Sequence, residues 1–406
     1  MKVFVALIAL FALNASVYSK YTFSTKVVDC EADYDIIQNY RDDMYEITAH
    51  LYQHIGPNAI NNHFVFSPLS IWITLSAIAE GLAYPEQLVM LQVLRLPTDL
   101  CARLKYYQLA TSRFVSSNDV DISSIRVLVI DEGVLINSTF HQFVYKHSLI
   151  DVVSAPLRSN PDKALEEIRR VVTVTSPNID ISGNSVILDA VDYNGLWSTA
   201  FDDAVLERSP FYSSLGDQIG AVDIMKVKRR ARISHFPALN LNCLELPVGY
   251  NDRYRMMFGI ILDENAAKTV NLVTSAAMID DFLNNVTDSY IPIEIAIPRF
   301  SLTSEYDVKA ILENSGVKDL WTDPAVTRLI SDPAVLPSAF VHRSTIVLDK
   351  AGLKSAEFES QLLTTEYNPA FELNFIANRP FLLWLFDAES HSVLMAGAFT
   401  KPTYSN

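Results

Sequence analysis

The chain has 406 residues, of which 50% are hydrophobic and 19% are charged, so it carries enough apolar material for a large core and is not a disordered chain. Lys and Arg total 32 against 47 Asp and Glu, and the resulting net charge of −15 disfavours binding to nucleic acid or to anionic membranes. None of the 12 glycines forms a GxGxxG or GxxxxGK[ST] loop, which disfavours a nucleotide-dependent enzyme.

The amino terminus has the pattern of a cleaved secretion signal. An apolar run from Val3 to Leu13 follows a single lysine, and Val17-Tyr18-Ser19 suits a signal peptidase. No later stretch approaches the roughly 20 uninterrupted apolar residues that cross a bilayer. The sequence therefore predicts a signal peptide at 1–19, one domain at 20–406, and a secreted, extracellular protein.

The cysteines and two glycosylation acceptors suit the same compartment. The acceptors are Asn137, in Asn-Ser-Thr, and Asn285, in Asn-Val-Thr. Three cysteines are an odd count, so at least one thiol has no partner within the chain. Cys243 lies in an alternating strand pattern, and we expect a buried free thiol there. Cys30 and Cys101 could form a disulfide between the N-terminal tail and the body, a pairing that the sequence leaves open.

Apolar periodicity predicts a mixture of helices and strands. The spacing over Asp35 to His54 indicates an amphipathic helix, which we expect to end at Gly56-Pro57. Ile293 to Pro298 alternates as a half-exposed strand does, and Asp307 to Asn314 has a helical pattern. Apolar runs on either side of 387–391 predict a buried hairpin. Because no regular βαβ repeat appears, we expect an α+β fold.

No compact catalytic signature is present: GxSxG, HExxH and CxxC are all absent. His50 and His54 are four residues apart and could share a metal, but further ligands are missing nearby, so we expect no metal and no cofactor. Ser67, Ser70 and His342 could be a nucleophile and base, yet polar links inside a core are the simpler interpretation. We therefore predict a protein that is not an enzyme.

Several phrases of the sequence resemble successive landmarks of the serpin (serine protease inhibitor) family. They are, in the family's order, Phe66-Ser67-Pro68-Leu69-Ser70-Ile71, Gly195-Leu196-Trp197, Cys243-Leu244-Glu245-Leu246-Pro247, Ile297-Pro298-Arg299-Phe300, Val341-His342-Arg343, Asn378-Arg379-Pro380-Phe381 and Gly397. The resemblance covers nearly the whole mature chain. It implies three β-sheets, about nine helices and an exposed reactive-centre loop at about 352–368. In inhibitory members a protease cleaves this loop and becomes acylated on it, and the loop then inserts into the main sheet.

The same resemblance implies that the loop's hinge begins at Gly352 and that its scissile bond joins Glu366 and Tyr367. Side chains on an inserted strand alternate between its faces, so four of them would turn into the core: Leu353, Ser355, Glu357 and Glu359. Burying two unpaired carboxylates costs several kcal/mol. A register shifted by one residue would instead bury Lys354, Ala356 and Phe358, and a buried lysine is no easier to accommodate.

We therefore expect insertion to be slow or incomplete. The prediction is a secreted, monomeric serpin-fold protein that binds or regulates a partner and inhibits weakly or not at all. The alternative is a suicide inhibitor of an extracellular serine or cysteine protease that accepts Glu366 at the scissile bond.

Two further features depart from the family pattern. In serpins, a hydrogen-bonded cluster that controls sheet opening includes residues matching Ser67, Ser70 and His342, but Asp189 stands where the family has asparagine. A carboxylate there favours a charged imidazole, so we expect an ion pair. Five basic residues also crowd together and predict either a solvated strand edge or a polyanion-binding patch: Lys226, Lys228, Arg229, Arg230 and Arg232.

Overall fold

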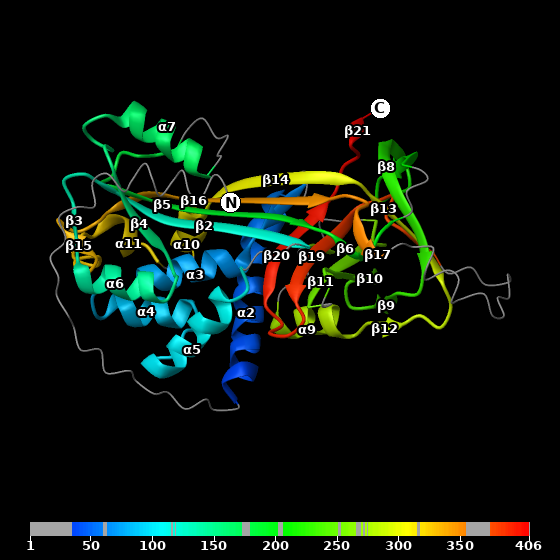
Figure 1. Cartoon of the computed structure of the whole chain (residues 1–406), viewed down its shortest axis with the longest axis horizontal. Helices are drawn as coiled ribbons and strands as arrows, with labels where there is room; N and C mark the ends of the chain where they lie inside the picture. Colours follow the sequence, from blue (N-terminus) through cyan, green and yellow to red (C-terminus); the bar gives the residue numbers. More distant parts are fainter. Residues whose placement is uncertain are drawn as a thin grey trace. The chain divides into compact units, whose positions relative to one another are not determined.

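Helices and strands are mixed along the whole chain in the computed structural model (Figure 1). The structure describes residues 35–59, 63–114, 117, 119–172, 179–201, 206–250, 253–264, 269–270, 273, 275–314, 317–354 and 374–405. Nine helices lie within them: α2 (Asp35–Ala59), α3 (Pro68–Ala79), α4 (Glu86–Val93), α5 (Leu100–Thr111), α6 (Ser138–Lys146), α7 (Pro161–Val172), α9 (Ala276–Asn284), α10 (Val308–Asn314) and α11 (Asp319–Thr322).

The described strands form three large sheets and one two-stranded ribbon. A nine-stranded sheet contains β1 (Phe64–Phe66), β6 (Trp197–Thr199), β9 (Arg232–Phe236), β10 (Leu241–Val248), β11 (Tyr254–Ile261), β12 (Thr287–Asp288), β17 (Gly352–Lys354), β19 (Phe381–Asp387) and β20 (Val393–Phe399). A second sheet contains β7 (Glu207–Tyr212), β8 (Gln218–Arg229), β13 (Ile293–Pro298), β18 (Asn374–Ile376) and β21 (Tyr404–Ser405). The ribbon pairs β3 (Leu135–Ile136) with β15 (Ser331–Asp332). The predicted α+β class is confirmed.

The third sheet positions the candidate site. Its strand order is β14 (Phe300–Asp307), β16 (Pro337–Leu348), β5 (Ser185–Gly195), β2 (Val120–Asp131) and β4 (Asp151–Ala155). In Figure 1, α3 lies beneath this sheet and α7 lies above it. All residues of α3 are buried, whereas α7 covers a separate apolar cluster on the outer face that includes Leu188 and Val341. Both faces of the sheet are therefore covered over part of its area.

Within this sheet β16 and β5 run parallel, while their other neighbours run antiparallel. Their pairing begins with Pro337 opposite Ser185 and, after an irregularity, runs from Phe340 opposite Ile187 to Val347 opposite Asn194. We call this junction of β5 and β16 the seam. Parallel strands cannot be joined by a tight turn, and the two strands are indeed far apart in sequence. Side-chain contacts between β5 and β16 add to the backbone hydrogen bonds that hold the seam closed.

Two sequence predictions differ from the observed elements. The first helix was expected to end at Gly56-Pro57, but it continues to Ala59. The reason is packing: a Cβ added at Gly56 would lie 2.8 Å from Val270 Cγ1, so this glycine allows a close contact and does not stop the helix. The expectation of a half-exposed strand at Ile293–Pro298 is also wrong, because β13 lies between β8 and β18 and only Glu294 is partly exposed.

The cysteines and the terminal segment complete the comparison. Cys243 is a buried free thiol on β10, and burial raises its pKa to about 12. Cys101 is disulfide-bonded, but Cys30 lies outside the described residues, so the pairing stays a prediction. Asp33–Asn406 forms one compact unit, and the predicted signal at 1–19 lies outside the described residues. Among the described helices, none is both long enough and apolar enough to cross a membrane.

The predicted carboxyl-terminal hairpin is confirmed as β19 and β20, and a buried carboxylate holds its turn. Asp387 is fully buried and accepts hydrogen bonds from the amide of Ser390 at 2.9 Å, from Arg113 at 3.2 Å and from Arg253 at 2.6 Å. Burial alone would raise the pKa of Asp387, but the Ser390 amide and the two guanidinium groups together hold it below its ordinary value.

This lowered pKa makes a pH-dependent prediction for Asp387→Asn. A carboxyl group with a depressed folded-state pKa stabilises the fold above its unfolded pKa of about 4 and loses that contribution as the pH falls through its folded pKa. We expect the variant to lose about 2 kcal/mol of unfolding free energy at pH 7, with the difference from wild type shrinking below about pH 4. Urea unfolding across this pH range measures it. Glu389→Gln is the control, because Glu389 meets the same arginines while 72% exposed and should change little.

Candidate functional site

A buried hydrogen bond crosses the seam. Asp189 on β5 and His342 on β16 are register partners, and both side chains are fully buried. His342 Nδ1 lies 3.1 Å from Asp189 Oδ1. Because the two residues belong to different strands, this bond must break whenever a further strand enters between β5 and β16.

Helix α3 supplies the remaining hydrogen bonds to Asp189. Ser70 Oγ donates to Oδ1 at 2.9 Å, and Thr74 Oγ1 donates to Oδ2 at 2.7 Å. Ser67 is the N-cap of α3, where its Oγ accepts the amide hydrogen of Ser70 at 3.2 Å. The cap and the following proline start the helix so that its first turns face the seam. We call the group formed by Ser67, Ser70, Thr74, Asp189, His342 and Ser344 the seam cluster.

The expected ion pair between Asp189 and His342 is not what the geometry shows. The amide of Ser67 donates to His342 Nε2 at 3.0 Å, and the hydroxyl of Ser344 lies 2.9 Å from the same nitrogen. An amide can only donate, so Nε2 must accept and carries no proton. The imidazole is therefore the neutral tautomer, protonated on Nδ1 and donating to the carboxylate. The expectation was wrong because the sequence does not show the Ser67 backbone facing the ring.

A positive charge on β2, the neighbour of β5 opposite β16, balances the buried carboxylate of Asp189. Arg126 on β2 is the register partner of Asp189, so the two side chains lie on the same face of the sheet. Burial lowers the pKa of Arg126, and Asp189 and Asp151 partly offset that effect. Its guanidinium donates to the carbonyls of Leu149 and Ser148 and to Ser124 Oγ. It therefore neutralises Asp189 at a distance without forming an ion pair with it.

A second contact crosses the seam on the outer face. Arg343, the residue after His342, donates from Nη1 to Asp192 Oδ1 at 2.8 Å. Asp192 is 47% exposed, so this pair is worth less than about 1 kcal/mol. Consecutive residues of β16 thus bridge the seam on opposite faces, and the inner bridge dominates because it is dry.

The first residues of the predicted hinge are paired just beyond the end of the seam, where Val347 lies opposite Asn194. Gly352 to Lys354 form β17, which pairs in parallel with β6. Trp197 holds the segment before it, because its amide donates to Ala351 O at 3.0 Å and its indole donates to Asp349 O at 2.6 Å. A Cβ at Gly352 would collide with the backbone of Ala200, which explains why glycine stands there.

Other predicted site residues fall outside the described part of the chain. These are Ser355, Glu357, Glu359, Glu366 and Tyr367, so the hinge beyond Lys354 and the scissile bond stay predictions. Of the described hinge residues, Leu353 is 38% exposed. The acceptors Asn137 and Asn285 are both exposed, as glycosylation requires.

The basic residues predicted as a polyanion patch do not share one face. Arg229 is buried and donates to Thr199 O at 2.9 Å, and Arg232 pairs with the buried Glu245 at 2.7 Å. Lys226 forms an ion pair with Glu207. Lys228 and Arg230 are exposed. Much of this charge therefore serves the packing of β8 and β9.

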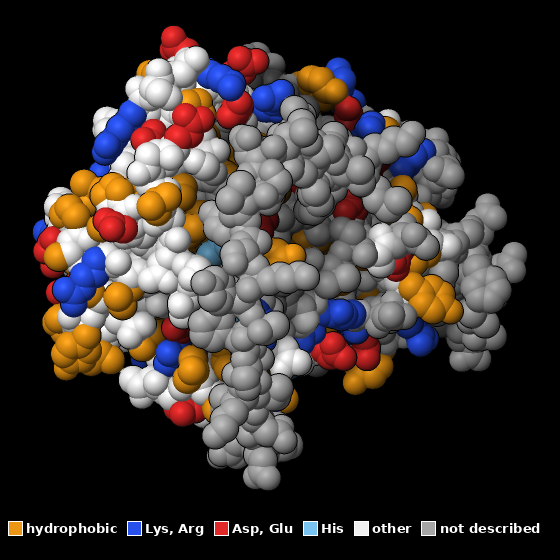
Figure 2. Space-filling view, turned by 60° about the vertical axis from the view of Figure 1, so that its left-hand side comes forward, with side chains coloured by type: hydrophobic (Ala, Val, Ile, Leu, Met, Phe, Trp, Pro, Cys, Tyr) orange, Lys and Arg blue, Asp and Glu red, His pale blue; other side chains and the backbone are white. Residues whose placement is uncertain are grey.

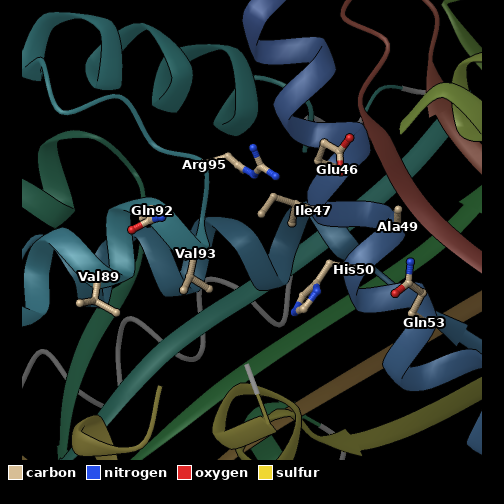
Figure 3. A pocket seen from close by; sticks show the side chains of 9 residues that line it. All are labelled: Glu46, Ile47, Ala49, His50, Gln53, Val89, Gln92, Val93 and Arg95. Atoms are coloured by element: carbon tan, nitrogen blue, oxygen red, sulfur yellow. The ribbon is translucent and has the colours of Figure 1, made fainter. Parts of the chain in front are cut away.

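A pocket of about 590 Å³ lies between α2 and α4, away from the elements of the seam (Figure 3). Its lining includes Glu46 and His50 from α2, Gln92 from α4, and Arg95. Burial, His54 and Arg95 all lower the pKa of His50. Within the described ranges, no group of three or more potential ligands could hold a metal, so the His50–His54 pair lacks the further ligands that a zinc site requires.

The seam cluster contains residues that sequence reasoning missed. Thr74 and Ser344 were not singled out, and neither was Arg126. Spacing carried a signal for the first two, because Thr74 lies four residues after Ser70 on a helix and Ser344 lies two residues after His342 on a strand. No comparable signal marked Arg126, because it depends on the antiparallel register of β2 against β5.

Comparisons with known proteins identify the family. A sequence model described as "Serpin (serine protease inhibitor)" matches residues 43–402, so the chain belongs to the serpin family. An uncharacterised serpin-like protein of Thermococcus kodakarensis is 25% identical over 370 residues, covering 87% of this chain and 84% of that protein.

Solved structures agree on the fold. Uncleaved ovalbumin is 18% identical with a TM-score of 0.78, covering 89% of this chain and 100% of ovalbumin. Native protease nexin-1 with heparin is 17% identical with a TM-score of 0.78, covering 90% of this chain and 100% of that protein. The predicted family and the predicted α+β fold of sheets and helices are therefore confirmed.

The seam cluster makes a stability prediction for Asp189→Ala. This change leaves the buried donors of Ser70, Thr74 and His342 without their acceptor, so we expect the free energy of unfolding to fall by about 3–5 kcal/mol. Asp189→Asn keeps one acceptor oxygen and should cost about 1 kcal/mol. Urea unfolding at pH 7 measures both, with the exposed Asp192→Ala as the matched control. Equal losses for Asp189→Ala and Asp192→Ala would contradict the assigned network.

Proposed function

We propose that this serpin is a secreted, non-catalytic protein that binds or regulates a partner and inhibits proteases weakly or not at all. Family membership supports the absence of catalysis, because serpins generally act as protease inhibitors and not as catalysts. The proposal of secretion rests on the signal pattern at 1–19 and on the two acceptors. The proposal of weak inhibition rests on the seam.

Inhibition by the family's route requires the cleaved loop to enter between β5 and β16. An inserted strand would present alternate side chains to the face that α3 covers, where Asp189 and His342 lie. With Glu357 and Glu359 turned inward, two more carboxylates would enter the layer that already holds a buried carboxylate. Like charges in a dry site repel, and each added acid would have to bind a proton before it could be buried. The buried carboxylate of Asp189 is the observation that carries the proposal.

The alternative register does not relieve this conflict. It would turn Glu357 and Glu359 to the outer face, part of which is the apolar cluster beneath α7. Lys354 would then face inward, and burying its ammonium group carries a desolvation cost of its own. Insertion must also release β17 from β6, next to the segment 349–351 that Trp197 holds by two hydrogen bonds and that we call the stem. In both registers, the release of β17 slows insertion, and the buried charges destabilise the inserted state.

A second candidate function remains in the same family. If insertion outruns deacylation, the protein is a suicide inhibitor of a serine or cysteine protease that accepts Glu366. The closed five-stranded sheet supports this alternative, because a closed seam is what an insertion-competent serpin would also begin from. A polyanion is a weaker partner candidate: one structural neighbour was solved with heparin, but here Lys226, Arg229 and Arg232 have partners within the protein.

Incubation with a protease panel tests the proposed function. The panel should include serine and cysteine proteases that cleave after acidic residues, and denaturing gels should follow the products. We expect cleavage near Glu366 without a covalent complex, because slow insertion lets the acyl-enzyme hydrolyse. A variant with Leu353→Thr, Glu357→Ala and Glu359→Thr removes the inward charges and should form the complex. A boiling-resistant complex with the unmodified protein would establish the inhibitor alternative.

A further inference from the structure

Four large apolar side chains are exposed around the end of the five-stranded sheet where β3 and β15 pair. Leu135 is 73% exposed, Tyr145 71%, Tyr84 74% and Leu329 47%. We call them the apolar patch. Hydrophobic side chains gather on the left of Figure 2, where this end of the protein comes forward. Soluble monomers rarely leave such a group uncovered, so its cover requires an explanation.

Backbone contacts place two of these residues beside Asn137 and a third on the loop that it contacts. The amide of Asn137 donates to Ile330 O at 2.8 Å, which places Leu329 beside it, and Leu135 precedes it by two residues. The amide of Ala83 donates to Val326 O at 2.8 Å, which brings Tyr84 to the same loop. Tyr145 lies along α6, the helix that Asn137 caps. Asn137 therefore adjoins Leu135 and Leu329, with Tyr84 and Tyr145 on the neighbouring loop and helix.

The side chain of Asn137 is available for modification. Its Oδ1 accepts the amide hydrogen of Thr139 at 2.9 Å, an arrangement that leaves the nitrogen Nδ2 pointing elsewhere. Within the described ranges Nδ2 has no hydrogen-bond partner. The other acceptor differs, because Asn285 Nδ2 donates to Asp281 Oδ1 at 2.8 Å and the exposed Asp288 lies three residues further on. One acceptor thus stands among apolar side chains and the other beside carboxylates.

We propose that an N-linked glycan on Asn137 covers the apolar patch and keeps the secreted protein monomeric. The C–H faces of sugar rings pack on aromatic and aliphatic side chains, while their hydroxyls remain in water. A covalently attached glycan has a high effective concentration at the patch. A protein partner would have to displace this tethered glycan before it could bind the patch. This inference rests on the secretion part of the proposed function and is independent of whether the loop inserts.

The test is expression in a secreting eukaryotic cell with Asn137→Gln and Asn285→Gln as a matched pair. Peptide mass spectrometry reports glycan occupancy, hydrophobic-dye fluorescence reports exposed apolar surface, and light scattering reports the monomer fraction against concentration. We expect Asn137→Gln to gain several-fold in dye fluorescence and to self-associate, whereas Asn285→Gln stays at the wild-type level. Adding Leu135→Ser and Tyr145→Ser to Asn137→Gln should restore the monomer.

Two outcomes overturn the inference. An unoccupied Asn137 in the secreted protein removes the proposed cover, and equal behaviour of the two single variants shows that the glycan shields nothing. If Asn137→Gln is not secreted, enzymatic removal of glycans from the folded wild-type protein replaces it, with the Asn285→Gln protein treated in parallel. Failure of these tests leaves the protease-panel result untouched, so the two proposals can fail separately.

Discussion

A buried carboxylate beside a parallel strand junction is the constraint on which the rest of the account depends. Asp189 satisfies donors from α3 and from His342 at once, and so it joins the helix under the sheet to both sides of the seam. Where an asparagine would offer one acceptor oxygen, the carboxylate offers two and brings a charge. That charge strengthens the hydrogen bonds of the closed sheet, and it also raises the free energy of burying any further carboxylate in the same layer.

The hinge and the seam therefore have to be considered together. A loop with small neutral residues adds no charge to a seam that contains Asp189, and a loop with Glu357 and Glu359 meets no buried acid in a seam that lacks one. This chain combines the two unfavourable features. The stem adds a separate barrier, because β17 is already paired with β6. These features act at different stages, the stem on the rate of release and the carboxylates on the stability of the inserted state.

Much of the fold could be predicted from sequence, because apolar periodicity reports which faces are buried. The β19–β20 hairpin and the helix near Val308 followed from it. Gly56-Pro57 misled because glycine ends helices and also permits close packing, and only the position of Val270 distinguishes the two. The seam cluster was predicted in part through the family pattern. The neutral state of His342 was not, because it depends on a backbone amide whose direction no sequence pattern encodes.

The most direct measurement is the melting temperature of the protein before and after proteolytic nicking of the loop between Ser360 and Tyr367. A strand that enters the seam adds hydrogen bonds on both sides and raises the melting temperature sharply, whereas a loop that stays out leaves it unchanged. We expect little change in melting temperature for the unmodified protein and a marked rise for the variant with Leu353→Thr, Glu357→Ala and Glu359→Thr. A large rise in the unmodified protein would show that the seam accepts the acidic hinge and would contradict the central claim.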